Sequence, residues 1–366
     1  QKIDIILAVE TVRKTRRMGV ETGVGGKYFT DPFFGNPMHR NCGKQAVVVL
    51  LVVFVLTIPL MRTEAAVGDC RKGDLDSRFC DQNGDLVADL PEDERAWLDP
   101  ATLIFAYTPV EDPAVYREVW SEFLDHLKQV TGKPVVFFPV QSNAAQLEAM
   151  RSGRLHVAGF NTGSTPLAVN CAGFVPFTMM AARDGTFGYQ MEIISWPGSG
   201  IEVIGDLKGR TLAFSSPTSN SGFKAPSAIL RSKFNLVADR DFSTVFSGKH
   251  DNTVLGVVHR DYDAGAIANS VKIRMISRQV IREADVKVLY RSETFPTTAY
   301  GHAHNLQPRL AERVRSAFAS FNWQGSRLLA EFQKSGDESF IPISYRERWG
   351  VIREIDAAND VSYACR

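Results

Sequence analysis

The sequence predicts an α/β protein of two lobes, because one pattern of strands and helices occurs twice along residues 101–366. Short apolar runs typical of buried strands alternate with amphipathic helical segments of about 10–15 residues. The pattern starts again after "SWPGSG" at 195–200, and a later segment returns to the first unit. We therefore expect two similar units around parallel or mixed sheets, with the second inserted into the first.

Clear start and stop signals mark the elements of the first unit. Asp112 and Pro113 are typical of a helix N-cap and first helical position, and Gly132 is typical of a helix end. Ser164 can cap a later helix, with Pro166 in its first turn. A short helix is expected over about 143–151. Strands are predicted at residues 102–107, 134–140 and 155–160.

The second unit repeats this order and is followed by a helical C-terminal part. Its helices are predicted at 223–234 and 250–260, and its strands at 211–214, 264–269 and 286–290. Residues 295–303 indicate the return crossing. Three amphipathic helices should follow, at about 307–321, 324–334 and 344–358. These patterns assign lobe 1 to residues 101–197 and 297–366, and lobe 2 to residues 198–296.

Polar residues stand at the predicted strand ends, where α/β sheets bind their ligands. The turn "SSPTSNSG" at 215–222 combines small hydroxyl and amide side chains immediately before a helix, an arrangement that suits an oxyanion. Ordinary helix capping is the alternative interpretation of this turn. The strand ends that should meet in one cleft carry Tyr107, Asn161, Thr162, Gly163, Ser215 to Ser221 and Asn269.

The motifs of several other protein classes are absent from the sequence. There is no G-x-S-x-G elbow, no P-loop or dinucleotide fingerprint, and no paired histidines or C-x-x-C motif for zinc. We therefore expect neither an enzyme nor a bound cofactor. The chain has 42 Lys and Arg against 41 Asp and Glu, so it lacks the basic excess that nucleic-acid binding requires.

An export signal is expected near the beginning of the chain. The apolar run at 46–60 is shorter than the about 20 residues of a membrane span, and small residues follow it. Residues 38–65 are therefore predicted to be a signal peptide, with cleavage after Ala65 and no membrane insertion afterwards; a membrane anchor is the alternative. Residues 1–37 are expected to be an upstream translation artefact. Residues 66–100 are polar and acidic and are expected to be an N-terminal extension that lies outside the core.

Four cysteines follow the predicted cleavage point. In an oxidising compartment, Cys70 and Cys80 are expected to form a disulfide because they are close in sequence. Cys171 and Cys365 could pair with each other or stay free. A lone cysteine in an apolar segment is usually a packing residue.

Several stretches resemble, in order, the phosphate/phosphite/phosphonate-binding proteins of ABC transporters. They include "FAYTPVEDPAVYREVW", "AMRSGRLHVAGFNTGS", "SSPTSNSGFKAP" and "SGKHDNTVLGVVHRDYDAGAIANS". The resemblance implies a periplasmic binding protein of the type II, Venus-flytrap architecture, with hinge crossings. It departs from phosphonate binders at Asn269, where those present an acidic residue. The implied ligand-binding positions are Tyr107, Asn161, Thr162, Gly163, Ser216, Thr218, Ser219, Asn220, Ser221, His250 and Asp251.

Within this family the chain looks most like periplasmic arsenite-binding sensors, because Cys171 in "PLAVNCAGFVPF" matches their cysteine. This resemblance implies that arsenite is bound by the Cys171 thiolate and that the protein signals to a membrane histidine kinase. Trivalent arsenic is soft and prefers thiolate sulfur. The alternative is a transport protein for phosphite, phosphonate or phosphate. Cys171 stands about seven residues after Ser164, or roughly 10 Å along a helix, so arsenite could require a separate subsite.

Overall fold

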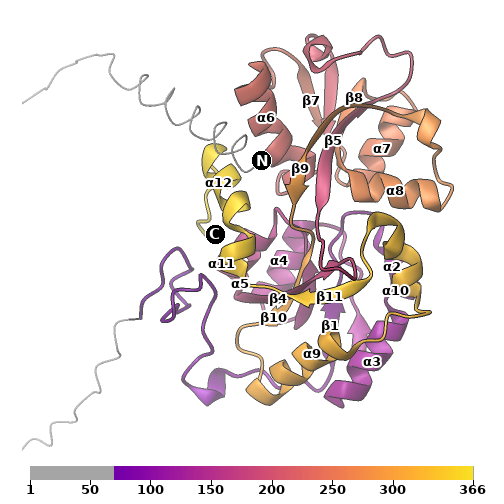
Figure 1. Cartoon of the computed structure of the whole chain (residues 1–366). Coiled ribbons are helices and arrows are strands. Elements are labelled where there is room, and N and C mark those ends of the chain that lie inside the picture. Colours follow the sequence, from indigo (N-terminus) through magenta and orange to yellow (C-terminus); the bar gives the residue numbers. More distant parts are fainter. Residues whose placement is uncertain (1–69, 366) are drawn as a thin grey trace, which may run out of the picture.

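The computed structural model describes residues 70–365, which form two α/β lobes that lie one above the other in Figure 1. Each lobe has its own mixed sheet, of six strands in lobe 1 and five in lobe 2. The prediction of two α/β units is thereby confirmed. The predicted signal peptide and the segment before it lie outside the described residues. Within residues 70–365, no helix is long and apolar enough to cross a membrane.

The lobe 1 sheet has the strand order β11-β4-β10-β3-β1-β2. β1 runs parallel to β2 and β3, whereas β10 is antiparallel to β3 and β4, and β11 is antiparallel to β4. β4 and β11 were not predicted. The strands are β1 (Leu103–Ala106), β2 (Val135–Phe137), β3 (Val157–Phe160), β4 (Phe174–Ala181), β10 (Ala299–Ala303) and β11 (Ser339–Pro342).

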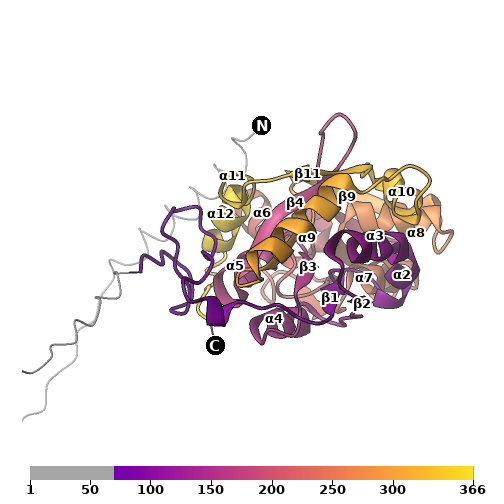
Figure 2. The same cartoon turned by 90° about the horizontal axis from the view of Figure 1, so that it is seen from below.

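Two of the predicted capping signals of lobe 1 act as expected, whereas the Ser164 side chain makes no capping hydrogen bond to the helix that follows it. The Asp112 side chain accepts a hydrogen bond from the Ala114 N–H, and Gly132 ends the segment at a positive φ of 70°. The single helix predicted between them is divided at Trp120, a fully buried residue. Figure 2 shows α3 beside α9. The helices are α2 (Pro113–Val119), α3 (Ser121–Thr131), α4 (Asn143–Arg151), α5 (Thr165–Ala172), α9 (Pro308–Ser320) and α10 (Arg327–Phe332), with the 3₁₀ turn η5 (Gln333–Ser335) after α10.

The lobe 2 sheet has the order β7-β6-β8-β5-β9. Its helices α6, α7 and α8 cover the sheet, and a π-helical turn, η3, leads into α6. The elements are β5 (Tyr189–Ser195), β6 (Thr211–Phe214), η3 (Asn220–Lys224), α6 (Ala225–Phe234), β7 (Ser243–Phe246), α7 (His250–Val258), β8 (Ala264–Ala268), α8 (Asn269–Ser277) and β9 (Lys287–Phe295). The short 3₁₀ turns η2 (Ile204–Leu207) and η4 (Glu283–Asp285) complete the lobe.

Two crossings join the lobes, from β4 to β5 and from β9 to β10. β5 pairs with β8 and β9 and therefore belongs to lobe 2. The lobe boundary predicted at residue 197 must accordingly move to the segment between β4 and β5. The sequence placed it too late because β5 was not identified as a strand, so "SWPGSG" was taken as the crossing.

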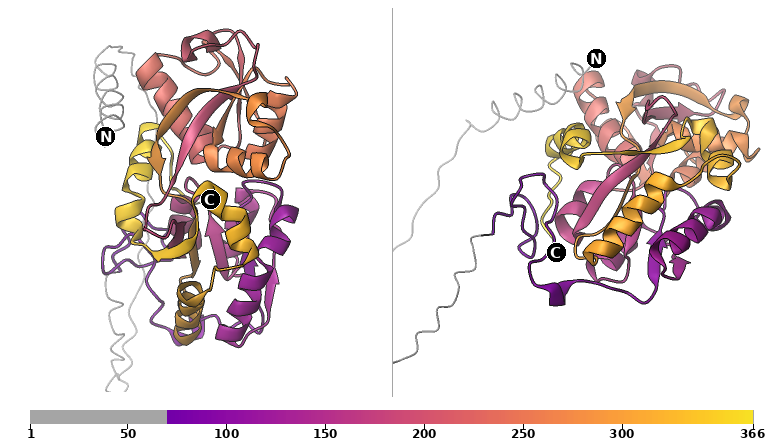
Figure 3. Two further views of the ribbon diagram at one scale, coloured as in Figure 1. Left: turned by 45° about the vertical axis from the view of Figure 1, so that its right-hand side comes forward. Right: turned by 60° about the horizontal axis from the view of Figure 1, so that its bottom comes forward.

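The C-terminal helices lie beside the junction of the lobes, as the left view of Figure 3 shows. They are α11 (Tyr345–Arg348) and α12 (Gly350–Ala358). Asp356 of α12 forms a 2.8 Å ion pair with Lys224 of lobe 2, and each of the two side chains is only 1% exposed. The same Lys224 ammonium donates to the Gly163 carbonyl at 2.8 Å. A lysine in this position therefore links lobe 2 to two segments of the rest of the chain.

The N-terminal extension is irregular from residue 70 to 93 but is not confined to the surface. Leu75, Phe79 and Val87 are buried within the main hydrophobic cluster, contrary to the prediction that this segment lies outside the core. The ring of Phe79 packs edge-on against His304 of lobe 1. The predicted disulfide between Cys70 and Cys80 is present, with a Cα–Cα distance of 5.4 Å. A 3₁₀ turn, η1 (Glu94–Ala96), precedes β1.

Candidate functional site

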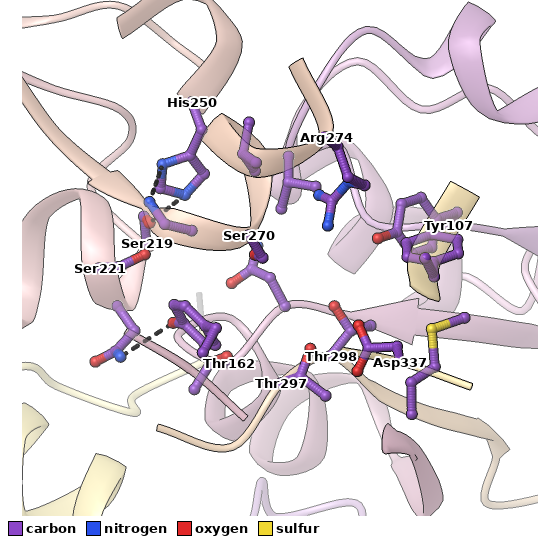
Figure 4. A pocket seen from close by; sticks show the side chains of 18 of the residues that line it. Tyr107, Thr162, Ser219, Ser221, His250, Ser270, Arg274, Thr297, Thr298 and Asp337 are labelled. Carbon is purple, nitrogen blue, oxygen red and sulfur yellow. Dashed lines mark hydrogen bonds between the residues drawn. The ribbon is translucent and has the colours of Figure 1, made fainter. Parts of the chain in front are cut away.

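A cavity of about 40 Å³ lies at the interface between the lobes, and both lobes supply its walls. Figure 4 shows the polar side chains that point into it. The lobe 2 wall comes from η3, α7 and α8, and the lobe 1 wall from the ends of β1 and β3, from β10, and from the segment after α10. The lining residues are Tyr107, Val110, Asn161, Thr162, Met180, Tyr189, Ser219, Asn220, Ser221, His250, Ala268, Ser270, Val271, Arg274, Thr297, Thr298, Tyr300, Phe332 and Asp337.

The Ser219–Ser221 turn presents hydroxyl and amide groups to the cavity at the end of lobe 2. The Ser219 hydroxyl oxygen accepts a hydrogen bond from the Gly222 N–H at 3.0 Å. A Cβ on Gly222 would lie 1.6 Å from the Ser215 hydroxyl, so only glycine allows this turn to pack on the strand end. The Asn220 amide donates to the Tyr189 hydroxyl at 3.2 Å. The turn is thus held from both sides.

His250 is held as a neutral donor at the edge of this turn. Its Nδ1 accepts a hydrogen bond from the Ala268 N–H at 3.2 Å, which places the ring proton on Nε2. Nε2 lies 3.3 Å from the Ser219 hydroxyl, to which it donates. Burial lowers the pKa of His250 to about 4. The ring is therefore uncharged at neutral pH and serves as a hydrogen-bond donor.

The Arg274 guanidinium brings a positive charge to the cavity and also connects the lobes. It donates to the Glu111 carboxylate of lobe 1 at 2.8 and 3.2 Å, and Arg278, which follows the last residue of α8, contacts the same carboxylate. Burial disfavours its charge, but the Tyr116 hydroxyl and Glu111 raise the pKa of Arg274 well above its usual value. Burial opposes ionisation of Glu111 as well, yet the two arginines keep the pKa of its carboxyl below its usual range. The Glu111 carboxylate and its two guanidinium partners therefore stay ionised. We call Glu111, Arg274 and Arg278 the inter-lobe latch.

Asp337 faces the cavity from lobe 1, immediately after η5. It is 8% exposed, and its carboxylate accepts no hydrogen bond from the residues that the structure describes. Burial raises the pKa of Asp337 to about 7, and the positive charge of Arg274 limits this rise. Thr297 and Thr298, on the crossing from β9 to β10, line the cavity near it.

The structure brings seven of the predicted site residues into the cavity wall. They are Tyr107, Asn161, Thr162, Ser219, Asn220, Ser221 and His250. Helix capping accounts for part of this set, since the Asn161 side-chain oxygen accepts from the Gly163 and Ser164 N–H groups at 3.1 and 2.9 Å. The residue nevertheless lines the cavity at the end of β3.

Five other predicted residues lie outside the cavity wall and hold the surrounding structure. Ser216 and Thr218 accept hydrogen bonds from the Asn143 amide of lobe 1, at 3.4 and 2.8 Å. Asp251 accepts from the Asp112 N–H at 3.0 Å, across the same interface. The Asn269 side chain accepts from the Gln190 N–H at 2.9 Å, within lobe 2. Gly163 sits where the backbones of the two lobes lie close together: a Cβ there would be 2.3 Å from the Thr218 carbonyl oxygen.

The sequence prediction missed Arg274, Asp337, Ser270 and the two threonines. Thr297 and Thr298 had a usable signal, because they lie in the stretch identified as the return crossing, and a crossing borders the cleft. Arg274 is five residues into a helix, and Asp337 follows a helix near the C-terminus. Neither residue follows a strand, so the expectation that ligands bind at the carboxyl ends of strands could not identify them.

The thiolate role predicted for Cys171 does not fit this geometry. Cys171 forms a disulfide with Cys365, with a Cα–Cα distance of 5.3 Å, and it does not line the cavity. Helix α5 starts near the cavity and carries Cys171 about 9 Å away, at its other end. There the C-terminal tail returns and supplies Cys365. No group of ligating side chains suited to a metal occurs within residues 70–365.

We expect the double substitution Cys171→Ser and Cys365→Ser to lower the free energy of unfolding by about 4 kcal/mol, because this disulfide closes a long loop. The cysteines are 194 positions apart. The measurement is urea unfolding of the purified protein, with the double serine variant of Cys70 and Cys80 as the control. That pair is 10 positions apart and should contribute less. Equal losses from the two variants would contradict the expectation.

Acidification from about pH 6.5 to pH 4 should destabilise the protein through His250. Its folded-state pKa is lowered to about 4 by burial, so the unfolded state takes up a proton first as the pH falls. The stabilisation is fully present above about pH 6.5 and is lost as the pH falls toward 4; its upper limit is about 3 kcal/mol. Urea unfolding at both ends of this range should show a smaller pH effect in His250→Gln than in the parent. Equal pH effects would contradict this assignment.

Comparison with known proteins identifies the family. The family model "ABC transporter, phosphonate, periplasmic substrate-binding protein" matches residues 105–347. The "Phosphate-import protein PhnD" of Mycolicibacterium smegmatis is 24% identical over 76% of this chain and 89% of its own. The "Phosphonates-binding periplasmic protein" of Escherichia coli K12 is 24% identical over 68% of this chain and 78% of its own.

Solved structures show the same fold. A binding-protein component of an ABC phosphonate transporter from Pseudomonas aeruginosa has a TM-score of 0.65 at 20% identity, over 73% of this chain and 90% of its own. PhnD1 from Prochlorococcus marinus, in complex with methylphosphonate, has a TM-score of 0.64 at 17% identity, over 72% of this chain and all of its own. The chain belongs to the periplasmic phosphonate substrate-binding proteins of ABC transporters.

Proposed function

We propose that this protein captures a small phosphorus oxyanion, such as phosphite, methylphosphonate or phosphate, in the inter-lobe cavity and delivers it to an ABC transporter. The observation that carries the proposal is the cavity itself, in which Arg274 and the hydroxyls of the Ser219–Ser221 turn face the same small space. Relatives named for phosphate import and phosphonate binding support this ligand class.

The size of the cavity limits the ligand. Its volume is about 40 Å³. A water molecule needs roughly 10–15 Å³ on the same measure, so the space holds about three oxygen-sized groups. That matches the head group of a tetrahedral oxyanion with at most a small substituent. A nucleotide or a long-chain phosphonate would require the lobes to separate.

The charge of the wall supports an anionic or weakly acidic ligand. Arg274 is cationic and is the positively charged side chain among the described residues that line the cavity. Its partner carboxylates Glu111 and Glu331, which also pair with Arg278, lie outside the cavity wall. His250 and Tyr107 are neutral, because burial lowers the pKa of the histidine and raises that of the tyrosine. Charge-assisted hydrogen bonds from the guanidinium and neutral donors from Ser219 and Ser221 would then surround the ligand oxygens.

Ligand capture is expected to favour the closed arrangement of the lobes. The inter-lobe latch joins the lobes beside the cavity, and Asn143 of lobe 1 donates to Thr218 of lobe 2. A ligand that contacts both walls binds the closed state better than the open one and shifts the population toward it. The closed conformation would then be the form that the membrane component of the transporter binds.

The test is isothermal titration calorimetry of the purified protein with phosphite, methylphosphonate, phosphate and sulfate. We expect at least one phosphorus oxyanion to bind at one site with a micromolar or lower dissociation constant. Small-angle scattering on the same samples should show the protein becoming more compact as that ligand binds. The absence of binding by all three phosphorus oxyanions would refute the proposal.

An arsenite sensor that signals to a histidine kinase is the second candidate. A disulfide sulfur has no thiolate that could displace hydroxide from As(OH)₃, and Cys171 is oxidised and 4% exposed. Arsenite could still use the cavity as an uncharged acid that donates to Asp337. Titration of arsenite against the parent, with and without a reductant, and against the Cys171→Ser, Cys365→Ser variant separates the routes: equal affinities in all three favour the cavity, and binding that only the reduced parent shows favours the thiol.

A further inference from the structure

We infer that Asp337 is a ligand-contacting residue that shares one proton with the bound oxyanion, so the cavity prefers ligands that bring their own O–H group. The inference rests on the proposed function and adds the residue that distinguishes one oxyanion from another. An anion that carries no proton can bind only when the Asp337 carboxylate is itself protonated.

The position of Asp337 points to a ligand contact. Its side chain is more than nine-tenths buried, lines the cavity, and accepts no hydrogen bond from the described part of the chain. Figure 4 shows the carboxylate and the Arg274 guanidinium entering the cavity from opposite sides. Burying an acceptor without a donor is costly, and a donor from the ligand would remove that cost.

A carboxylate in an anion site has a defined chemical consequence. A fully deprotonated ligand oxygen and an ionised Asp337 would repel each other at short range. If one of them carries a proton, the two oxygens form a short charge-assisted hydrogen bond instead. A phosphonate or phosphite monoanion supplies that proton from its P–OH group. A sulfonate has no such proton, so it can bind only when Asp337 itself is protonated.

The other ionisable groups around the cavity do not change charge near neutral pH. Among the described lining residues, these groups are Tyr107 just after β1, Tyr189 of β5, His250 of α7, Arg274 of α8 and Tyr300 of β10. Burial lowers the pKa of His250 to about 4 and raises the pKa of each tyrosine, while Arg274 stays charged. Only Asp337, with a pKa of about 7, titrates in this range within the described cavity wall.

The test compares methanesulfonate with methylphosphonate. The two anions have the same shape, but only the methylphosphonate monoanion carries an O–H proton. Calorimetric titrations of the parent and Asp337→Asn are made between about pH 6 and pH 8.5. At the upper end about one Asp337 in thirty is protonated. Methanesulfonate should therefore bind the parent roughly 30-fold more weakly there, and Asp337→Asn should remove this pH dependence and bind it more tightly than the parent. Sulfonate binding that is absent in the parent and appears in the variant supports the same conclusion.

Glu331→Gln is the matched control, since Glu331 lies 3.7 Å from the Arg274 guanidinium but does not line the cavity. It should keep the pH dependence of the parent. If Asp337→Asn weakens both ligands equally at every pH, Asp337 is only structural and the inference is wrong. If that variant does not fold, the titrations of the parent protein provide the test. Methanesulfonate binding to the parent that is tight and independent of pH overturns the inference. A parent that binds methylphosphonate in either case leaves the proposed function intact, whereas one that binds no phosphorus oxyanion overturns both.

Discussion

Arg274→Gln is expected to weaken phosphorus oxyanion binding by roughly 150-fold, or about 3 kcal/mol. The guanidinium is the cation of the cavity wall, and it also joins α8 to Glu111 of lobe 1. Its loss removes a charge-assisted contact with the ligand and half of the inter-lobe latch. Calorimetric titration of the ligand identified in the panel measures the effect.

Arg278→Gln is the control for this prediction. Arg278, the residue that caps the end of α8, contacts the same Glu111 carboxylate but does not line the cavity. Its substitution should reduce affinity by less than about tenfold, through weaker closure alone. Equal losses from the two variants would mean that Arg274 acts on closure only and does not contact the ligand.

Gly163→Val is expected to abolish ligand-induced closure while each lobe stays folded. A Cβ at this position would lie 2.3 Å from the Thr218 carbonyl oxygen and 2.4 Å from the Asn220 amide nitrogen, both in the opposite lobe. The backbones therefore cannot approach, and the cavity loses its lobe 2 wall. Affinity should fall by about 100-fold or more, because the ligand then contacts one lobe only.

Small-angle scattering with and without ligand measures this effect directly. The parent should become more compact on binding, and Gly163→Val should not. Gly205→Ala is the control, since a Cβ on Gly205 meets no atom within 4 Å. A Gly163→Val protein that still closes and binds like the parent would contradict the assignment of Gly163 as a position where closure requires glycine.

The sequence predicted most of lobe 1 and lobe 2 because strand and helix signals there are local. Asp112 and Gly132 act within one turn of the helices that they begin or end. The long strands β4 and β5 were missed for a different reason. Both are antiparallel and lie where the chain crosses between lobes, so the strand–helix alternation that located the other strands is absent.

Part of the candidate site could also be predicted, because its residues follow strands that the local sequence pattern identifies. Asn161, Thr162 and Ser219 to Ser221 follow strand ends, and strand ends in such sheets meet at the ligand. Arg274 and Asp337 come together only when the lobes close on each other, which no local pattern encodes. The pairing of Cys171 likewise depends on the return of a tail 194 residues later. The sequence therefore left open whether Cys171 and Cys365 pair or stay free.

The most direct test of the central claim is a crystal structure of the protein grown with methylphosphonate. The account predicts a phosphonate group between the lobes, with its oxygens within hydrogen-bond distance of Arg274, Asp337 and the Ser219–Ser221 turn. It also predicts an intact disulfide between Cys171 and Cys365, away from the ligand. A ligand bound elsewhere, or separated lobes with no phosphonate between them at saturating concentration, would contradict it.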